Sequence, residues 1–213
     1  MGRDKALLEI PAGGWFLSRL AITFGRAGCR RVIAVVGPGA MERVAAAAAR
    51  DRLGLELVLN PDPARGQLSS LQIALAALSG DAPRAVLVCP VDQPLVAEET
   101  VRRVLEGWMR TGAPIVRPAR GERHGHPVLF DARILPELAA ADLAAGARPV
   151  VHAHAHESLD VETDDPGAFE DIDTPEDYQR VFGRPISAST ASAPPPARTP
   201  TDRMRTGRRL RRR

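Results

Sequence analysis

Asp92 and Lys5 are the two side chains of this 213-residue sequence whose types best suit chemistry on phosphates. Asp92 follows the apolar run 84–89, where α/β sheets gather their ligands, and a carboxylate there can hold Mg²⁺ while leaving sites open for phosphate and water. Lys5 is the only lysine beside 28 arginines, and its compact ammonium suits contact with phosphate. The alternatives are a turn aspartate ahead of Pro94 and a surface lysine near a chain terminus.

A helix start further along the chain carries two more carboxylates. Thr174 can cap this helix, Pro175 suits its first turn, and Asp177 can complete a capping box. Asp171 and Asp173 therefore abut a helix N-terminus, where carboxylates also act simply as caps and partners of the helix dipole. Taken alone, the pattern favours that structural role.

Residues 60–71 are expected to form a loop that leaves a strand and enters a helix. Gly66 lets the backbone come close to a ligand, and amides and hydroxyls near Ser69 and Ser70 can donate hydrogen bonds to it. The same residues also suit an ordinary loop with a helix cap.

Histidines occur in two further motifs. Residues 124–127 place two of them around a glycine before an apolar run, where they could contact substrate or metal or belong to a structural turn. Three more stand at alternate positions, so a strand would align their imidazoles on one face, as in a metal tract, whereas a helix would scatter them. The sequence leaves both interpretations, a strand and a helix, open for these three residues, His152, His154 and His156.

Composition excludes several classes of protein. No apolar run approaches the roughly 18–20 residues of a membrane span, which favours a cytoplasmic protein. Cys29 and Cys89 lack the paired spacing of a disulfide framework or zinc site. The net charge of +3 divides into +8 on residues 184–213 and −5 on the rest, and this Arg-, Pro- and Ser-rich tail is expected to be disordered. The body has no basic stripe, so nucleic acid is not the expected partner.

Short apolar runs alternate with helical patterns along residues 1–183. This β-α-β-α order predicts an α/β domain of three layers, with a mostly parallel central sheet covered by helices on both faces. Strands are expected at 31–37, 55–59, 84–89, 113–118, 126–130 and 158–163, and helices at 14–27, 40–52, 68–79, 98–110 and from 174 onward.

Five motifs in this order give the chain a resemblance to a known family. They are Met-Gly-Arg-Asp-Lys at 1–5, Asn-Pro with Gly and Ser-Ser-Leu at 60–71, Val-Asp-Gln-Pro-Leu at 91–95, Gly-His-Pro-Val-Leu-Phe at 125–130, and Asp-Ile-Asp-Thr-Pro-Glu-Asp-Tyr at 171–178. The sequence resembles the MobA-like nucleotidyltransferases, and within them the molybdenum cofactor cytidylyltransferases. The resemblance implies a Rossmann-like nucleotidyltransferase fold in which an acceptor phosphate attacks the α-phosphate of a nucleoside triphosphate.

The resemblance also implies roles for single residues. Lys5 would neutralise triphosphate charge, Asp92 would bind Mg²⁺, and Asp173, or less readily Asp171, would complete the metal site. The nucleotide pocket would be lined by Gly66, Ser69 and Ser70. The pterin or another acceptor would be faced by Gly125, His126 and Pro127, and Arg148 would meet the acceptor phosphate.

One departure from the family concerns the beginning of the domain. The family has a strand and a glycine-rich phosphate loop immediately before the motif at 1–5, and this sequence begins at that motif. The domain at 1–183 is therefore expected to lack a central strand, either because the start codon is placed too late or because the protein is truncated and binds without catalysing.

The sequence thus predicts a cytoplasmic, Mg²⁺-dependent nucleotidyltransferase that uses CTP in preference to GTP and modifies molybdopterin. One alternative is a noncatalytic or chaperone-like protein that holds the cofactor or a nucleotide and docks a molybdoenzyme or other partner through its tail. Another is transfer to a sugar phosphate by the same metal chemistry.

Overall fold

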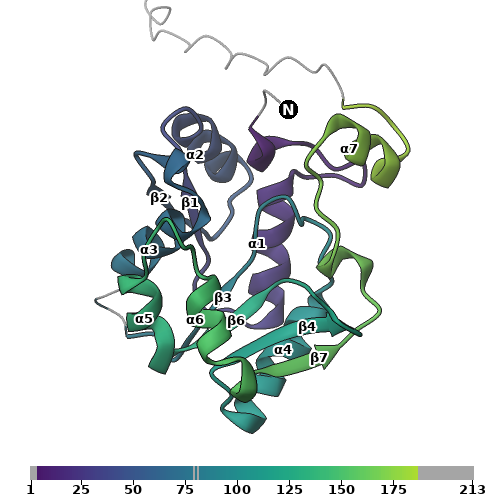
Figure 1. The fold of residues 1–213 in the computed structure, drawn as a ribbon. Helices are drawn as coiled ribbons and strands as arrows, with labels where there is room; N and C mark the ends of the chain where they lie inside the picture. The colour runs from purple at the N-terminus through teal and green to yellow at the C-terminus, as the bar shows by residue number, and fades with distance from the viewer. Residues whose placement is uncertain (1–3, 79, 81, 187–213) are drawn as a thin grey trace, which may run out of the picture.

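The computed structural model describes residues 4–78, 80 and 82–186. Within them the α/β fold is confirmed, with strands and helices alternating along the chain (Figure 1). Residues 1–3 of the first motif and residues 187–213 of the expected tail lie outside the described part. Among the described helices, none is long and apolar enough to cross a membrane.

The strands form two hydrogen-bonded groups. β1 (Ile33–Val36) and β2 (Glu56–Leu59) make a parallel pair. The second group is a five-stranded sheet in the order β3-β6-β4-β5, with β7 paired to the other side of β4. Its members are β3 (Ala85–Val88), β4 (Ile115–Arg120), β5 (Arg123–His124), β6 (Val128–Asp131) and β7 (Leu159–Glu162).

Strand directions in this sheet are more mixed than the expected mostly parallel arrangement. β6 runs antiparallel to both β3 and β4, whereas β7 runs parallel to β4. The reason is the short connection from β4 through β5 to β6, because a connection of a few residues can only join antiparallel neighbours. A parallel pair needs a longer crossover, which the segment from β6 to β7 supplies.

Helices cover both faces of the strands. The first face carries α1 (Phe16–Ala27), α2 (Met41–Arg50) and α4 (Glu98–Thr111), and the second carries α3 (Gln67–Ala77), α5 (Leu135–Ala140) and α6 (Arg148–Ala153). A last helix, α7 (Pro175–Phe182), lies beside the beginning of the chain (Figure 1). The arrangement is the three-layer sandwich that the alternation predicts.

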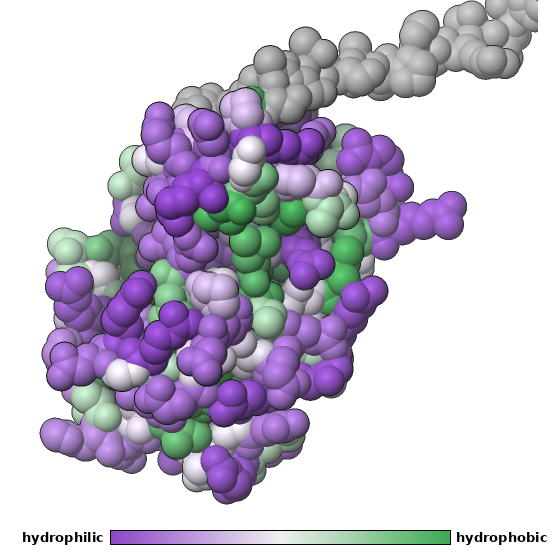
Figure 2. Space-filling model, turned by 90° about the vertical axis from the view of Figure 1, so that its right-hand side faces the viewer, coloured by the Kyte–Doolittle hydropathy of each residue, from purple (hydrophilic) through white to green (hydrophobic). Residues whose placement is uncertain are grey.

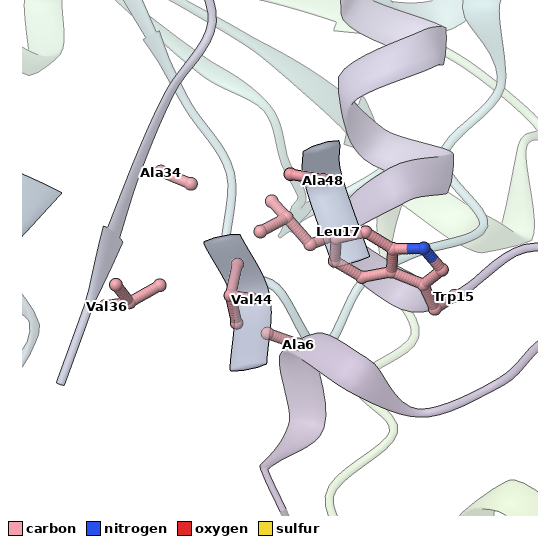
Figure 3. Packing of buried hydrophobic residues seen from close by; sticks show 7 residues of the cluster. All are labelled: Ala6, Trp15, Leu17, Ala34, Val36, Val44 and Ala48. Atoms are coloured by element: carbon pink, nitrogen blue, oxygen red, sulfur yellow. The ribbon is translucent and has the colours of Figure 1, made fainter. Parts of the chain in front are cut away.

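Side-chain alternation along β1 decides which helices lie on which face. Ala34 and Val36 are buried and pack against Leu17 of α1 and Val44 of α2. Figure 3 shows these side chains pointing toward one another, with Trp15 closing the far side of the cluster. The Trp15 indole N–H still has a hydrogen-bond partner in this packing, because it donates to Asp51 Oδ2 at 2.7 Å.

No strand of the described residues joins β1 to β3. The ladder of β1 with β2 uses the carbonyls of Val32 and Val36, so the backbone groups of Ile33 and Val35 point away from β2. On β3, the bond from Ala132 N to Arg84 O fixes the register, which turns the amides of Ala85 and Leu87 away from β6. Within residues 4–186 as described, these two strand edges have no strand partner, and α1 packs on both groups of strands.

The histidine run falls at the end of α6 and in the 3-10 turn at Ala155–Glu157. Its helical conformation separates the imidazoles, and His154 bonds to Glu137 Oε2 at 3.0 Å. The interpretation of this run as a strand, which would align the three imidazoles on one face, is wrong. Nowhere in the described part of the chain do three acidic, histidine or cysteine side chains gather closely enough to hold a metal.

Candidate functional site

The centre of the site is an ammonium between two carboxylates. Lys5 Nζ donates to Asp92 Oδ2 at 3.0 Å and also bonds to Asp173 Oδ1. These partners stand 87 and 168 positions away in the sequence. Burial alone would lower the pKa of Lys5, but the hydrogen bonds to Asp173 and Asp92 outweigh it and raise the pKa above its ordinary value. The lysine is therefore a fixed positive charge at neutral pH.

Local structure holds each member of this group. Lys5 opens a 3-10 turn in which the Asp4 side chain accepts a hydrogen bond from Ala6 N, and Ala6 is buried against the α2 side of the core. Asp92 follows β3, as expected, at the carboxyl end of the strand. Its carbonyl accepts from Ile172 N at 2.8 Å, which ties the loop after β3 to the loop before α7.

The start of α7 positions Asp173. Thr174 caps the helix and Asp177 completes the capping box, as the sequence predicts. Asp177 Oδ2 accepts from Thr174 N at 2.9 Å and from Asp173 N at 3.3 Å. The Asp173 side chain is 58% exposed, so a ligand can approach it from solvent.

Asp171 lies in a different environment from Asp173. Its Oδ1 accepts from Gln93 Nε2 at 2.7 Å, and Gln93 is 4% exposed. The structure thus brings Asp173 to Lys5 and Asp171 to Gln93. Gln93 was not among the residues expected to take part in the site. The one feature of the sequence that points to it is its position directly after Asp92, in the loop that follows β3.

The loop at residues 60–71 is ordered by a residue that sequence reasoning missed, Asn60. Its buried amide donates to Ser69 Oγ and Ser70 Oγ, both at 3.0 Å, and its Oδ1 accepts from Asp62 N at 3.0 Å. Ser69 Oγ in turn donates to Gly66 O at 2.7 Å. Gly66 has φ +91°, a conformation that side-chain-bearing residues rarely adopt. The loop is therefore held in one shape before any ligand binds.

The glycine-histidine turn packs against the loop that leads to Asp171. His126 N donates to Ala168 O at 2.8 Å, and a Cβ on the buried Gly125 would come within 2.2 Å of that same carbonyl oxygen. Burial lowers the pKa of His126, although the nearby charges of Asp171 and Asp92 oppose the shift. His126 is thus neutral at pH 7 and close to the carboxylates. Pro127, joined to it by a cis peptide bond, leads into β6.

Arg148 is placed apart from this group. It begins α6, is exposed, and has no polar contact with Lys5 or Asp92 in the part of the chain that the structure describes. The neighbouring Val150 packs into the cluster under α3 and α5.

The donor set fits a divalent cation that is shared with a substrate. Asp92 and Asp173 both reach one cationic atom, Lys5 Nζ, so their oxygens already converge on a single point. Two carboxylates without a third protein ligand match the way Mg²⁺ is held, since it keeps waters and takes substrate phosphate oxygens as its remaining ligands. Lys5 adds positive charge beside that position, so Lys5 and a cation held by the two carboxylates could together neutralise phosphate oxygens and orient them.

Comparison with known proteins identifies the family of the chain. Residues 1–158 match the family of MobA-like NTP transferase domains. A protein of Mycobacterium avium named probable molybdenum cofactor guanylyltransferase is 30% identical over 125 residues, which are 58% of this chain and 59% of the relative. A protein of the same name from Mycobacterium tuberculosis is also 30% identical. The chain thus spans less than two thirds of the length of these curated relatives.

Solved structures show the same fold. Rv0371c from Mycobacterium tuberculosis has a TM-score of 0.72 and 29% identity over 86% of this chain and 91% of its own. Its complex with manganese has a TM-score of 0.67 over 86% of this chain and 94% of that one. A 4-diphosphocytidyl-2C-methyl-D-erythritol synthase from Anaerococcus prevotii shares the fold alone, with a TM-score of 0.65 and 14% identity over 82% and 87% of the two chains. By its matched sequence, which covers most of its length, the chain belongs to the MobA-like NTP transferase domain family.

Proposed function

We propose that this protein transfers a nucleoside monophosphate from a nucleoside triphosphate to the molybdenum cofactor and releases pyrophosphate. The observation that carries the proposal is the contact of Lys5 Nζ with Asp92 and Asp173, which gathers one cation and two carboxylates at the carboxyl end of β3. The names of the curated relatives support the molybdenum cofactor as acceptor.

In the proposed reaction, an acceptor phosphate oxygen forms a bond to the α-phosphorus while the bond from that phosphorus to the bridging oxygen of the β-phosphate breaks. The electron pair leaves with pyrophosphate. Lys5 stabilises charge on the triphosphate, and Asp92 and Asp173 would hold Mg²⁺. That ion, when bound, supplies charge neutralisation and orientation of phosphate oxygens. The residues from Gly66 to Ser70 would contact the nucleotide, and Gly125, His126 and Pro127 the acceptor.

The base of the nucleotide is the part of the proposal for which sequence and comparisons differ. The motifs resemble those of the cytidylyltransferases, which favours CTP, whereas the curated relatives carry the name guanylyltransferase, which favours GTP. A direct competition between equal concentrations of CTP and GTP decides between them. The proposed setting is the cytoplasm, where both nucleotides are available.

The first test measures pyrophosphate release by the purified protein with Mg²⁺, the molybdenum cofactor and either CTP or GTP. We expect release with one of them, and its loss in Asp92→Asn. Glu99→Gln, which removes one carboxylate from the exposed side of α4, serves as the matched control and should keep the activity. Nucleotide binding without pyrophosphate release would instead favour the noncatalytic alternative. Release with a sugar phosphate but not with the cofactor would change the acceptor and leave the chemistry intact.

A further inference from the structure

Two arginines face each other at the end of the β4–β5 hairpin. Arg120 is the last residue of β4, Arg123 is the first of β5, and the two are direct cross-strand partners. Both are exposed. Like charges placed directly opposite each other on a sheet repel, so this pair is unfavourable unless another group compensates. Among the described residues, neither forms an ion pair with a carboxylate, and Glu122 in the turn between them pairs with neither.

Two other arginines of β4 and α7 are differently placed. Arg117, three residues earlier on β4, donates to Asp160 Oδ1 at 2.7 Å, and Arg180 of α7 bonds to both Asp177 and Glu170. Their charges are already matched. Unlike Arg117 and Arg180, Arg120 and Arg123 have no carboxylate partner among the described residues. Figure 2 shows one face of the molecule, which is mainly hydrophilic around an apolar patch.

Phe169 holds both guanidinium groups. The Arg120 Cζ lies 5.0 Å from the centroid of the Phe169 ring, and the Arg123 Cζ lies 5.7 Å from the same centroid. Arg123 Nη2 also donates to Phe169 O at 3.3 Å. A ring that faces two cations attracts each of them and limits their movement, while the remaining N–H groups of both forks stay free for a ligand.

This pair stands next to the candidate site. Phe169 lies two residues before Asp171, and its ring edge would be 2.9 Å from a Cβ on Gly125. From Arg123 to His126 the chain advances three residues, which spans at most about 11 Å. The distance between the two arginines and the residues expected to face the acceptor is therefore short enough for one small substrate molecule to span.

We propose that Arg120 and Arg123 form a clamp for an oxyanion, of phosphate-like charge density, that the acceptor carries. Guanidinium forks match the geometry of phosphate oxygens and bind them in pairs, and a dianion between the two would also relieve their mutual repulsion. This proposal rests on the proposed nucleotidyl transfer and names the part of the site that recognises the acceptor.

Transfer kinetics test the source of the oxyanion. The double variant Arg120→Gln with Arg123→Gln should raise the KM for the molybdenum cofactor at least tenfold and leave the KM for the nucleotide within twofold. The control is Arg103→Gln with Arg110→Gln on α4, which removes the same charge from exposed positions and should change neither constant. A rise in the nucleotide KM alone would assign the clamp to the triphosphate and overturn the proposal, and so would unchanged constants.

A binding measurement keeps this test separate from that of the transfer reaction. Inorganic phosphate is titrated into the wild-type protein while the side-chain Nε–Hε signals of the arginines are followed by NMR. We expect saturable shifts of Arg120 and Arg123 and smaller shifts of Arg103 and Arg110. Such shifts in a protein that transfers no nucleotide would retain the oxyanion site and reject the proposed function. Equal shifts of all four arginines would reject the clamp, even in an active enzyme.

Discussion

The Lys5 ammonium lies 3.0 Å from Asp92 Oδ2 while it also bonds to Asp173, so one side chain near the start of the chain joins the loop after β3 to the loop before α7. The Lys5 side chain is 27% exposed and that of Asp92 is 19% exposed. Both are thus shielded enough for their charges to interact strongly, yet they remain accessible to a phosphate arriving from solvent.

Replacing Lys5 tests the role of this ammonium in transfer. Lys5→Met should lower kcat by about 10²-fold, the usual effect of losing one donor to a developing negative charge. Lys5→Arg keeps the charge but not the compact shape, so it should fall between wild type and Lys5→Met. Steady-state rates with urea unfolding curves for each variant provide the measurement. Equal rates in Lys5→Met and wild type would remove Lys5 from the reaction.

The close approach at Gly125 predicts a local loss of stability. A Cβ there would meet Ala168 O at 2.2 Å, so Gly125→Ala must shift one of two backbone segments and should cost about 1–3 kcal/mol in the free energy of unfolding. Gly39→Ala has open space at its Cβ and should change stability by less than about 0.5 kcal/mol. Chemical denaturation of the two variants compares them, and similar midpoints would show that the turn at Gly125 adapts freely.

The cap of α7 should influence the site through Asp173. Thr174→Ala removes the side-chain acceptor for Asp177 N and should destabilise the protein by about 1 kcal/mol. Because Asp173 N shares Asp177 Oδ2 with Thr174, we also expect weaker binding of Mn²⁺, measured by electron paramagnetic resonance. Thr174→Ser keeps the hydroxyl and should behave as wild type. Weaker Mn²⁺ binding in the serine variant too would point to the methyl group rather than to the cap.

The open edge of β3 predicts an alternation in amide hydrogen exchange. Val86 and Val88 donate to β6, whereas the amides of Ala85 and Leu87 point toward β1 without a strand partner in the described residues. Ala85 and Leu87 should therefore exchange faster than their immediate neighbours, which serve as internal controls. Uniform protection along β3 in NMR exchange experiments would mean that the edge is covered in solution.

His126 predicts a pH dependence with a definite sign. Its pKa in the folded protein is lowered by burial, so the unfolded chain takes up a proton that the folded protein resists. The free energy of unfolding should therefore fall as the pH drops below about 6.5, the ordinary value for histidine. His126→Gln should flatten this fall between pH 7.5 and 5.5 in urea titrations. In Asp171→Asn, loss of the opposing charge should lower the NMR titration midpoint of His126 further.

Most elements could be predicted from sequence because their signals are local. The apolar runs at β1, β2 and β3 and the cap residues of α7 each determine their own conformation, and all of them are confirmed. The direction of β6 could not be foreseen from its apolar pattern, which is the same for a parallel or an antiparallel neighbour. It depends on the two-residue strand β5, too short to leave a pattern of its own.

The residues that organise the site were harder to foresee than those expected to contact phosphate. Asn60 and Gln93 act by hydrogen bonds to other side chains, Ser69 and Asp171 among them. Such pairings depend on tertiary approach between segments that are distant in sequence or bent by a loop. A single sequence holds no periodicity that reports them, so only the fold reveals which amides are buried and toward what they point.

The break between the two groups of strands has a mechanical consequence. The loop at residues 60–71 follows β2, and Asp92 follows β3, so the two halves of the candidate site are attached to separate hydrogen-bonded groups of strands. Among the described residues, side-chain packing over α1, rather than a continuous backbone network, sets the distance between them. A nucleotide that contacts both Gly66 and Lys5 would link the two groups of strands, so binding of a substrate would reduce the motion of one group relative to the other.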